Sequence, residues 1–129
     1  VVEVLRLSRD DSGTCKAALK AVKALAEGLA SNKSTMGAAG ACEMVLAALR
    51  GSEDDADVGL AALEAVAALS EGMPSNQHAM RQAGACEVLV TTLQVLSRDA
   101  PPVRVAAVHA IAAVSDGLTA NQNAMRRAG

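Results

Sequence analysis

The side chains best suited to chemistry are a run of carboxylates, three cysteines and two histidines. The carboxylates lie in residues 51–57, GSEDDAD, and a cluster of acidic side chains is a reason to consider Ca²⁺. The run lacks the spaced ligands, the central Gly and the terminal Glu of an EF-hand loop. We therefore expect a solvated loop between helices at this place rather than a metal site.

The cysteines and histidines form no recognisable reactive set. Cys15, Cys42 and Cys86 make no CxxC pair and no cluster with His. Cys42 and Cys86 both stand in the sequence GACE, which favours small buried hydrophobic residues, and reduced thiols fit an intracellular, cytoplasmic protein. His78 and His109 have no partner at the spacing of a metal site or a catalytic triad. The sequence predicts no catalytic residue, no metal, no cofactor and no enzymatic activity.

Composition narrows the class of protein further. The chain has 129 residues, of which 51% are hydrophobic and none is aromatic, and its net charge is -2. Without a basic field or aromatic rings to stack on bases, nucleic acid is not an expected partner. No uncharged apolar stretch reaches about 18 residues, so no membrane insertion is expected. Because alternating, β-branched or aromatic strand patterns are also missing, the sequence predicts an all-α fold.

A repeat runs through the whole sequence. Asn32, Asn76 and Asn121 recur at intervals of 44 and 45 residues. A Met follows each Asn by four positions and a Gly follows it by eight. These landmarks are Met36, Met80 and Met125, and Gly40, Gly84 and Gly129. Three copies in register predict a repeat architecture rather than three copies of a reactive motif.

The first part of each copy has room for a short helix. In the second copy, NQHAMRQAG, it covers residues 76–83, with Ser75 or Asn76 as the expected N-cap and Gly84 as the break. We also expect Gly84 to adopt a backbone conformation, or a close approach, that a side chain would forbid.

Two longer helices complete the copy. Residues 85–96 carry apolar side chains at i, i+3 and i+4 spacing, which predicts an amphipathic helix. Pro101 and Pro102 break it and suit the first turn of the next helix. That third helix covers residues 103–115, is apolar nearly all round, and is therefore expected to be the most deeply buried, with Gly117 ending it.

The strings N-x-x-x-M-x-x-A-G-A-C-E at residues 76–87 and A-L-x-A-V-x-A-L at residues 62–69 resemble the armadillo-repeat family. The resemblance implies a right-handed α-solenoid with three helices per repeat. Its three repeats would be residues 1–40 (partial), 41–84 and 85–129. Residues 1–7 resemble the end of a second helix, and the final short helix lacks its own second helix. We therefore expect part of a longer array, ends covered by another chain, or end-to-end self-association.

The resemblance also implies a function. In the armadillo family the third helices line a concave groove that binds a protein or an extended peptide. The Trp and Asn ladder of nuclear import carriers is absent, because its positions fall on Lys20, Glu64, His109 and on Ala24, Ala68, Ala113. The chain is therefore not of the import-carrier type. The positions assigned to the groove are Lys16, Lys20, Lys23, Leu60, Glu64, Glu71, Val105, His109 and Asp116.

These residues suggest a groove that is basic on the first copy and acidic on the second, which would favour a partner with the opposite order of charge. The leading interpretation is a protein-interaction scaffold. Two alternatives remain: the adaptor or regulatory segment of a larger enzyme of the ubiquitin ligase, kinase or GTPase type, and a structural subunit of a cytoskeletal or ciliary assembly.

Overall fold

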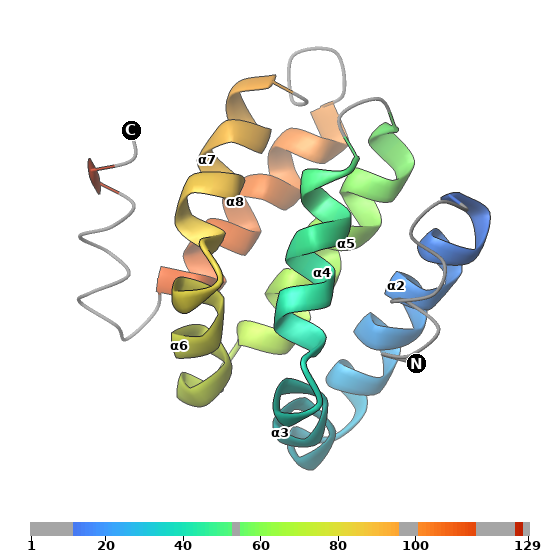
Figure 1. Cartoon of the computed structure of the whole chain (residues 1–129), viewed down its shortest axis with the longest axis vertical. Coiled ribbons are helices and arrows are strands. Elements are labelled where there is room, and N and C mark those ends of the chain that lie inside the picture. Colours follow the sequence, from blue (N-terminus) through green and yellow to red (C-terminus); the bar gives the residue numbers. More distant parts are fainter. Residues whose placement is uncertain (1–11, 53–54, 96–100, 116–125, 128–129) are drawn as a thin grey trace.

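A computed structural model describes residues 12–52, 55–95, 101–115 and 126–127 of the chain. Throughout these residues the regular structure is helical, which confirms the all-α prediction for the described part (Figure 1). The helices are α2 (Ser12–Gly28), α3 (Ala30–Ala38), α4 (Ala41–Arg50), α5 (Ala56–Ser70), α6 (Pro74–Gln82), α7 (Ala85–Val95) and α8 (Pro101–Ser115). The expectations for residues 1–7, for Gly117 and for the last short helix at 121–129 fall largely outside the described residues.

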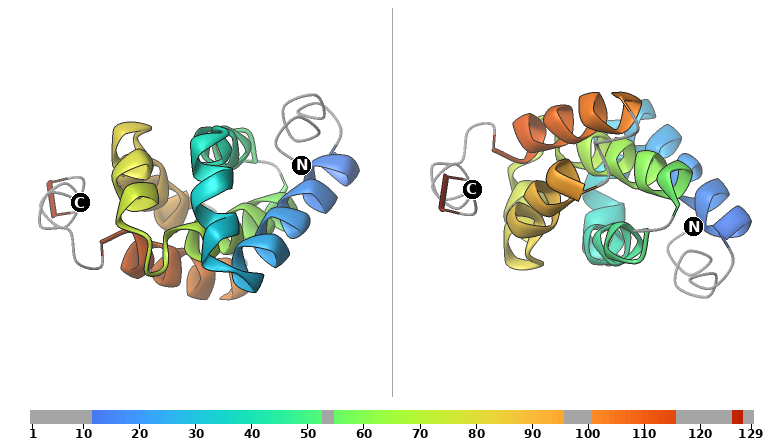
Figure 2. Two further views of the ribbon diagram at one scale, coloured as in Figure 1. Left: turned by 90° about the horizontal axis from the view of Figure 1, so that it is seen from below. Right: turned by 90° about the horizontal axis from the view of Figure 1, so that it is seen from above.

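The three longest helices, α2, α5 and α8, lie side by side with α5 in the middle (Figures 1 and 2). The second layer consists of α4 and α7, which pack on α5 and α8 respectively, and the short helices α3 and α6 lie at one end. The helix bounds follow the sequence period, since α3 and α6 are both nine residues long and begin 44 positions apart. The order of a short helix, a medium helix and a long helix thus occurs twice, as α3, α4 and α5 and again as α6, α7 and α8.

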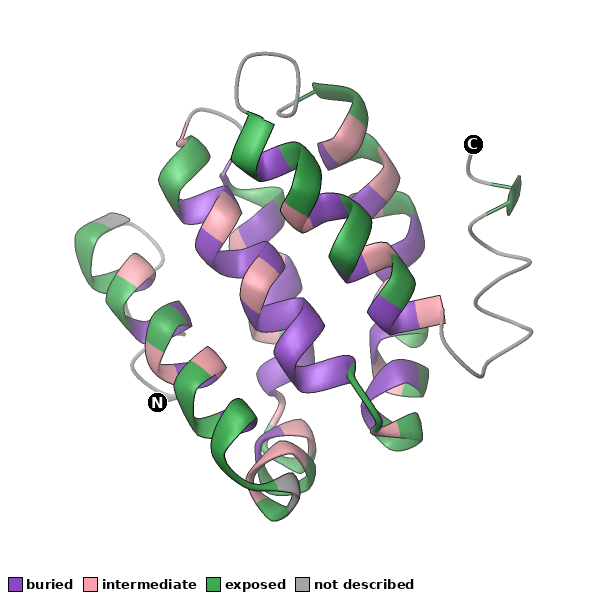
Figure 3. Ribbon diagram, turned by 180° about the vertical axis from the view of Figure 1, so that it is seen from behind, coloured by how far each residue is buried: buried purple, intermediate pink, exposed green. Residues whose placement is uncertain are grey.

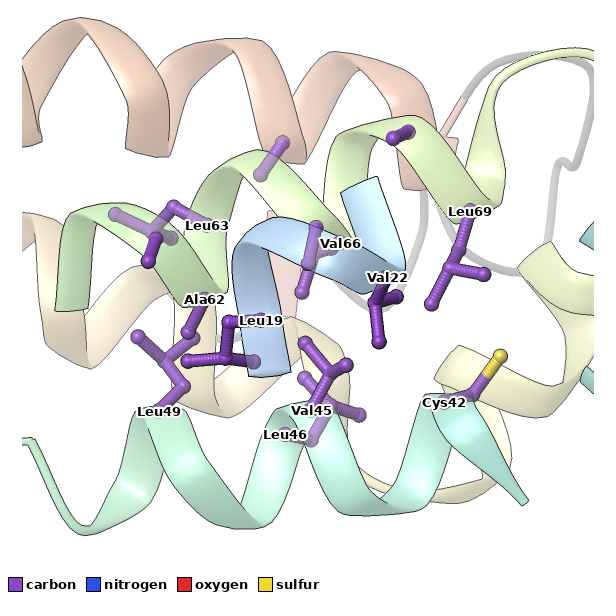
Figure 4. Packing of buried hydrophobic residues seen from close by; sticks show 14 of the residues in the cluster. Leu19, Val22, Cys42, Val45, Leu46, Leu49, Ala62, Leu63, Val66 and Leu69 are labelled. Carbon is purple, nitrogen blue, oxygen red and sulfur yellow. The ribbon is translucent and has the colours of Figure 1, made fainter. Parts of the chain in front are cut away.

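α5 is the most deeply buried of the described helices. From Val58 to Ser70 only Leu60 and Glu64 are not buried. The prediction that the helix at residues 103–115 would be the most buried is wrong, because α8 has a long helix packed on only one side and five of those residues are exposed. In the view from behind (Figure 3), α5 is coloured as buried along most of its length, whereas α2 and α8 on either side carry exposed stretches. Small Ala side chains let the neighbouring helices approach closely, and Leu63 shares one hydrophobic core with Leu19 of α2 and others from α4 (Figure 4).

The ends of α7 and α8 agree closely with the predicted ones. α7 covers 85–95, against the predicted 85–96, and residue 96 lies outside the described part. α8 begins at Pro101, so Pro101 and Pro102 occupy its first turn, where a missing backbone N–H breaks no helical hydrogen bond.

The acidic run at 51–57 has a local structural role. Asp55 is the N-cap of α5, and its Oδ1 accepts hydrogen bonds from the backbone N–H groups of Asp57 at 3.1 Å and Val58 at 3.2 Å. Asp57 lies in the first turn of α5 rather than in the expected loop, and a carboxylate there is favoured by the helix dipole. Residues 53–54 lie outside the described part.

The start of α6 differs from the prediction. α6 begins at Pro74 and its N-cap is Met73, without a capping hydrogen bond from a side chain. The prediction that Ser75 or Asn76 caps this helix is therefore wrong. Asn76 lies inside the first turn and is buried, so its amide is available for a different contact.

Asn76 ties helix ends together instead of capping one. Its Nδ2 donates to the backbone oxygen of Leu69 at 2.8 Å and to that of Lys33 at 3.0 Å. Asn32 makes the equivalent bond in the preceding copy, where Nδ2 donates to the oxygen of Leu25 at 3.0 Å. In both copies the acceptor lies seven residues before the Asn. The recurring Asn thus satisfies a carbonyl at the C-terminal end of the preceding long helix.

Gly40 and Gly84 form the turns before α4 and α7 in the left-handed conformation, with φ of 91° and 86°. This confirms the conformational part of the expectation for Gly84. A Cβ at Gly84 would also lie 2.9 Å from Nη2 of Arg50, whose side chain donates to the backbone oxygen of Ala83.

We predict that Gly84→Ala lowers the free energy of unfolding by about 1–2 kcal/mol, since a Cβ is disfavoured in the left-handed region. The matched control is Gly51→Ala, because Gly51 has φ of -84° and a Cβ there would make only ordinary contacts. Urea denaturation followed by circular dichroism measures both variants. Equal effects of the two substitutions would show that the turn conformation is not what matters.

The three cysteines are buried and form no disulfide bond, as expected for Cys42 and Cys86. Cys42 is fully buried in the core, and its burial raises the pKa of the thiol to about 12. Burial also raises the pKa of Cys86. Both groups are therefore neutral thiols at physiological pH, which makes them poor nucleophiles.

A raised thiol pKa makes stability depend on pH. The stabilisation is fully present below the ordinary thiol pKa of 9.0 and is lost as the pH rises toward about 12. We predict that above pH 9.0 the free energy of unfolding falls with pH more steeply for the wild-type chain than for Cys42→Ala. The difference in slope should reach about 1.4 kcal/mol per pH unit. Urea denaturation of both proteins at a series of pH values measures this slope. Parallel pH profiles would contradict burial of the Cys42 thiol.

Candidate functional site

The exposed side of α2, α5 and α8 carries two Lys–carboxylate ion pairs and one His–carboxylate contact between neighbouring helices. We call this surface the three-helix face; it is turned toward the viewer in Figure 3. Nζ of Lys23 lies 3.0 Å from Oε2 of Glu64, and Nζ of Lys16 lies 3.7 Å from Oδ2 of Asp57. These two pairs join α2 to α5. On the other side of α5, Nε2 of His109 lies 2.7 Å from Oε1 of Glu71 and joins α5 to α8.

Helical spacing explains why these side chains meet. Lys16, Lys20, Lys23 and Glu27 follow one another at intervals of four, three and four residues, so they lie along one side of α2. Because α2 and α5 pack side by side, this row meets the acidic row of α5. Small alanines at the contact allow charged side chains of adjacent helices to reach each other.

The ion pairs revise the predicted order of charge along the groove. Lys16 and Lys23 were expected to form a basic face with Lys20, but each is paired with a carboxylate of α5. The hydrogen bond to Glu64, and then its charge, raises the pKa of Lys23. Lys20 is exposed and forms no ion pair with the described residues. The first copy is therefore less basic in effect than its sequence suggests.

A small pocket of about 130 Å³ lies on the three-helix face and spans all three helices. Its lining residues are Lys23, Glu27, Glu64, Ala67, Ala68, Glu71 and His109. Four of these, Lys23, Glu64, Glu71 and His109, belong to the groove predicted from the sequence. With three carboxylates against one ammonium group and one imidazole, the pocket has an excess of acidic groups.

Glu27 is the functional candidate that sequence reasoning missed. It stands 44 positions before Glu71, so the same period that identified Glu71 points to it. It also follows Lys23 by four residues on α2, which places it on the same side of the helix. Applying the period to every predicted groove position would have found it.

The other predicted groove residues do not line this pocket. The predicted residues outside it that the structure describes are Lys16, Lys20, Leu60 and Val105. Val105 is 71% exposed to solvent. Asp116 lies outside the described residues. The structure thus brings four of the nine predicted residues to one pocket and leaves four other described ones outside it.

A larger cavity, of about 340 Å³, lies between α4 and α7 in the other layer, away from the three-helix face. Its lining residues are Leu49, Arg50, Glu87, Val88, Thr91, Thr92 and Val95. It shares no residue with the charged pocket. The sequence did not predict this cavity, because the periodicity of apolar residues within a helix does not give the distance between α4 and α7.

The chemistry available on these surfaces is ionic and hydrogen-bonding. In the described ranges, no three side chains of His, Cys, Asp or Glu gather as a metal site would require. His78 is exposed on α6. Over the same residues, no helix has both the length and the apolar character needed to cross a membrane.

Comparison with known proteins gave no match to a family model, to a curated protein or to a solved structure.

The Lys23–Glu64 pair offers a direct test of the packing of α2 against α5. We predict that Lys23→Glu lowers the free energy of unfolding and that adding Glu64→Lys restores most of the loss. Both side chains are more than a third exposed, so the coupling should be only about 0.5 kcal/mol. A double-mutant cycle in urea at low salt measures it. The absence of coupling at low salt would contradict the contact between these two side chains.

Proposed function

We propose that this chain is a protein-interaction scaffold of the armadillo-like α-solenoid type, which binds an extended segment of a partner along the three-helix face. The observation that carries the proposal is the pocket on that face, where charged side chains from α2, α5 and α8 converge. A ligand lying across the three helices would contact charged side chains of each helix in turn.

The architecture supports an elongated ligand. α2, α5 and α8 are equivalent helices of successive copies and lie side by side, so the exposed rows of α2 and α8 flank the half-buried Leu60 and Glu64 of α5. Equivalent helices placed side by side present similar side chains at regular intervals. An extended peptide has a regularly spaced backbone and can contact each interval in the same way. The resemblance to armadillo repeats noted in the sequence points to the same kind of ligand.

The pocket indicates the charge of that ligand. Lys23 is held by Glu64, and His109 is held by Glu71, which leaves Glu27 without an ion-pair partner among the described residues. The net charge of the pocket is therefore negative, because three carboxylates outnumber the one ammonium group and the one imidazole. We propose that a Lys or Arg side chain of the bound segment lies here, since charge complementarity directs such contacts.

A random peptide library tests this proposal, because it presents many candidate ligands to the chain at once. We predict that panning with the 129-residue chain enriches extended sequences that contain a basic residue. Replacing two of the three pocket carboxylates, Glu27→Gln with Glu71→Gln, should weaken the binding of an enriched peptide by about tenfold, because charge-assisted hydrogen bonds are lost. Fluorescence anisotropy with a labelled peptide measures the dissociation constant.

The matched control is Glu87→Gln, which removes one carboxylate from the cavity between α4 and α7. It should leave the affinity unchanged. If Glu87→Gln weakens the peptide while the pocket variant does not, the ligand binds in the other layer and the proposal for the three-helix face is wrong. Failure to enrich any peptide would count against the scaffold function itself.

A further inference from the structure

The outer side of α8 is an apolar face that has no neighbour among the described residues. Equivalent positions of α5 lie 45 residues earlier, and α8 packs against α5. Leu63 of α5 is fully buried, whereas its equivalent on α8, Val108, is 54% exposed. Ala67 is likewise buried and its equivalent Ala112 is exposed. The positions that α8 covers on α5 are thus uncovered on α8.

The side of α2 that faces away from α5 is also exposed, at positions whose equivalents on α5 are buried. Its equivalents on α5 lie 44 positions later, where α2 itself covers them. Leu69 is fully buried, but the equivalent Leu25 is 43% exposed. Ala68 is buried, and the equivalent Ala24 is exposed.

These two faces are the two halves of the contact that the chain already makes between α5 and α8. On α5 the positions of Leu63 and Ala67 are buried, and the open face of α8 has Val108 and Ala112 at the same positions. On α8 the positions of Ala110, Ala113 and Val114 are buried, and the open face of α2 has Ala21, Ala24 and Leu25 at the same positions. Both halves therefore present side chains of nearly the same shape and polarity as an interface that packs well within the chain.

We propose that a second copy of this chain covers these faces, with α8 of one molecule packing against α2 of the next. The occupant is a second copy because each open face carries the side chains of one side of the packing between α5 and α8, so the two faces complement each other. A contact between two different faces is heterologous, so it leaves one open face of each kind at the ends of every assembly. The assembly therefore grows head to tail.

Several positions differ between α5 and α8, and the change from Gly59 to Arg104 is the largest in side-chain size. Arg104 on α8 stands where α5 has Gly59, which is buried, so a long side chain replaces a hydrogen atom at the edge of the new contact. Arg104 must turn outward for α2 of the next molecule to approach. This difference makes the contact between molecules weaker than the contact between α5 and α8.

Sedimentation velocity over a range of concentration tests the proposal. The wild-type chain should shift from its 13.0 kDa monomer to larger species as the concentration rises. We predict that Val108→Glu, which damages only the α8 face, and Ala24→Glu, which damages only the α2 face, each remain monomeric. Gln94→Glu, on the exposed side of α7, should associate like the wild type. Far-UV circular dichroism confirms that all variants keep their helicity.

Mixing the two damaged variants distinguishes this arrangement from a symmetric one. The Ala24→Glu variant keeps an intact α8 face and the Val108→Glu variant keeps an intact α2 face, so an equimolar mixture should form a one-to-one complex that grows no further. A wild-type chain that stays monomeric at high concentration would overturn the proposal. So would a single variant that still dimerises by itself, because that requires a face to pair with its own copy.

Discussion

The burial of α5 on both sides is the constraint on which the rest of the structure depends. Its sequence is apolar nearly all round, so this helix is stable only when α2 and α8 cover its opposite sides and α4 covers a third. With no aromatic side chain available, the contact relies on Ala, Val and Leu, and therefore on close approach of the helices. The row of α2, α5 and α8, and with it the charged face that they share, follows from this requirement.

Polar contacts at the helix ends fix the position of these helices. Asn76 joins α6 to carbonyl groups of both α5 and α3, and Gly37 leaves room for it, since a Cβ there would collide with Oδ1 of Asn76. Gln77 donates from Nε2 to the backbone oxygens of Ser70 at 3.0 Å and Ala113 at 3.1 Å, which ties α5 to α8. Buried carbonyl groups left without these donors would be costly, so the two amides favour one register of the long helices over others.

Much of the fold could be predicted from the sequence because helix boundaries depend on local signals. The proline pair in the first turn of α8 and the left-handed Gly84 are fixed by backbone chemistry, and both lie where the sequence predicted them. The role of Asn76 could not be predicted, since its acceptors lie in two other helices. The site shows the same limit: the period placed Glu64 and Glu71, whereas the pairing of Lys23 with Glu64 depends on how α2 and α5 pack.

Hydrogen–deuterium exchange of the intact chain, read by mass spectrometry, tests the central position of α5 most directly. Amides open by local or global unfolding, and the most deeply packed helix opens last. We expect α5 to exchange more slowly than both α2 and α8, each of which has one uncovered side. Exchange of α5 at the same rate as α2 and α8 would contradict a structure organised around a central helix.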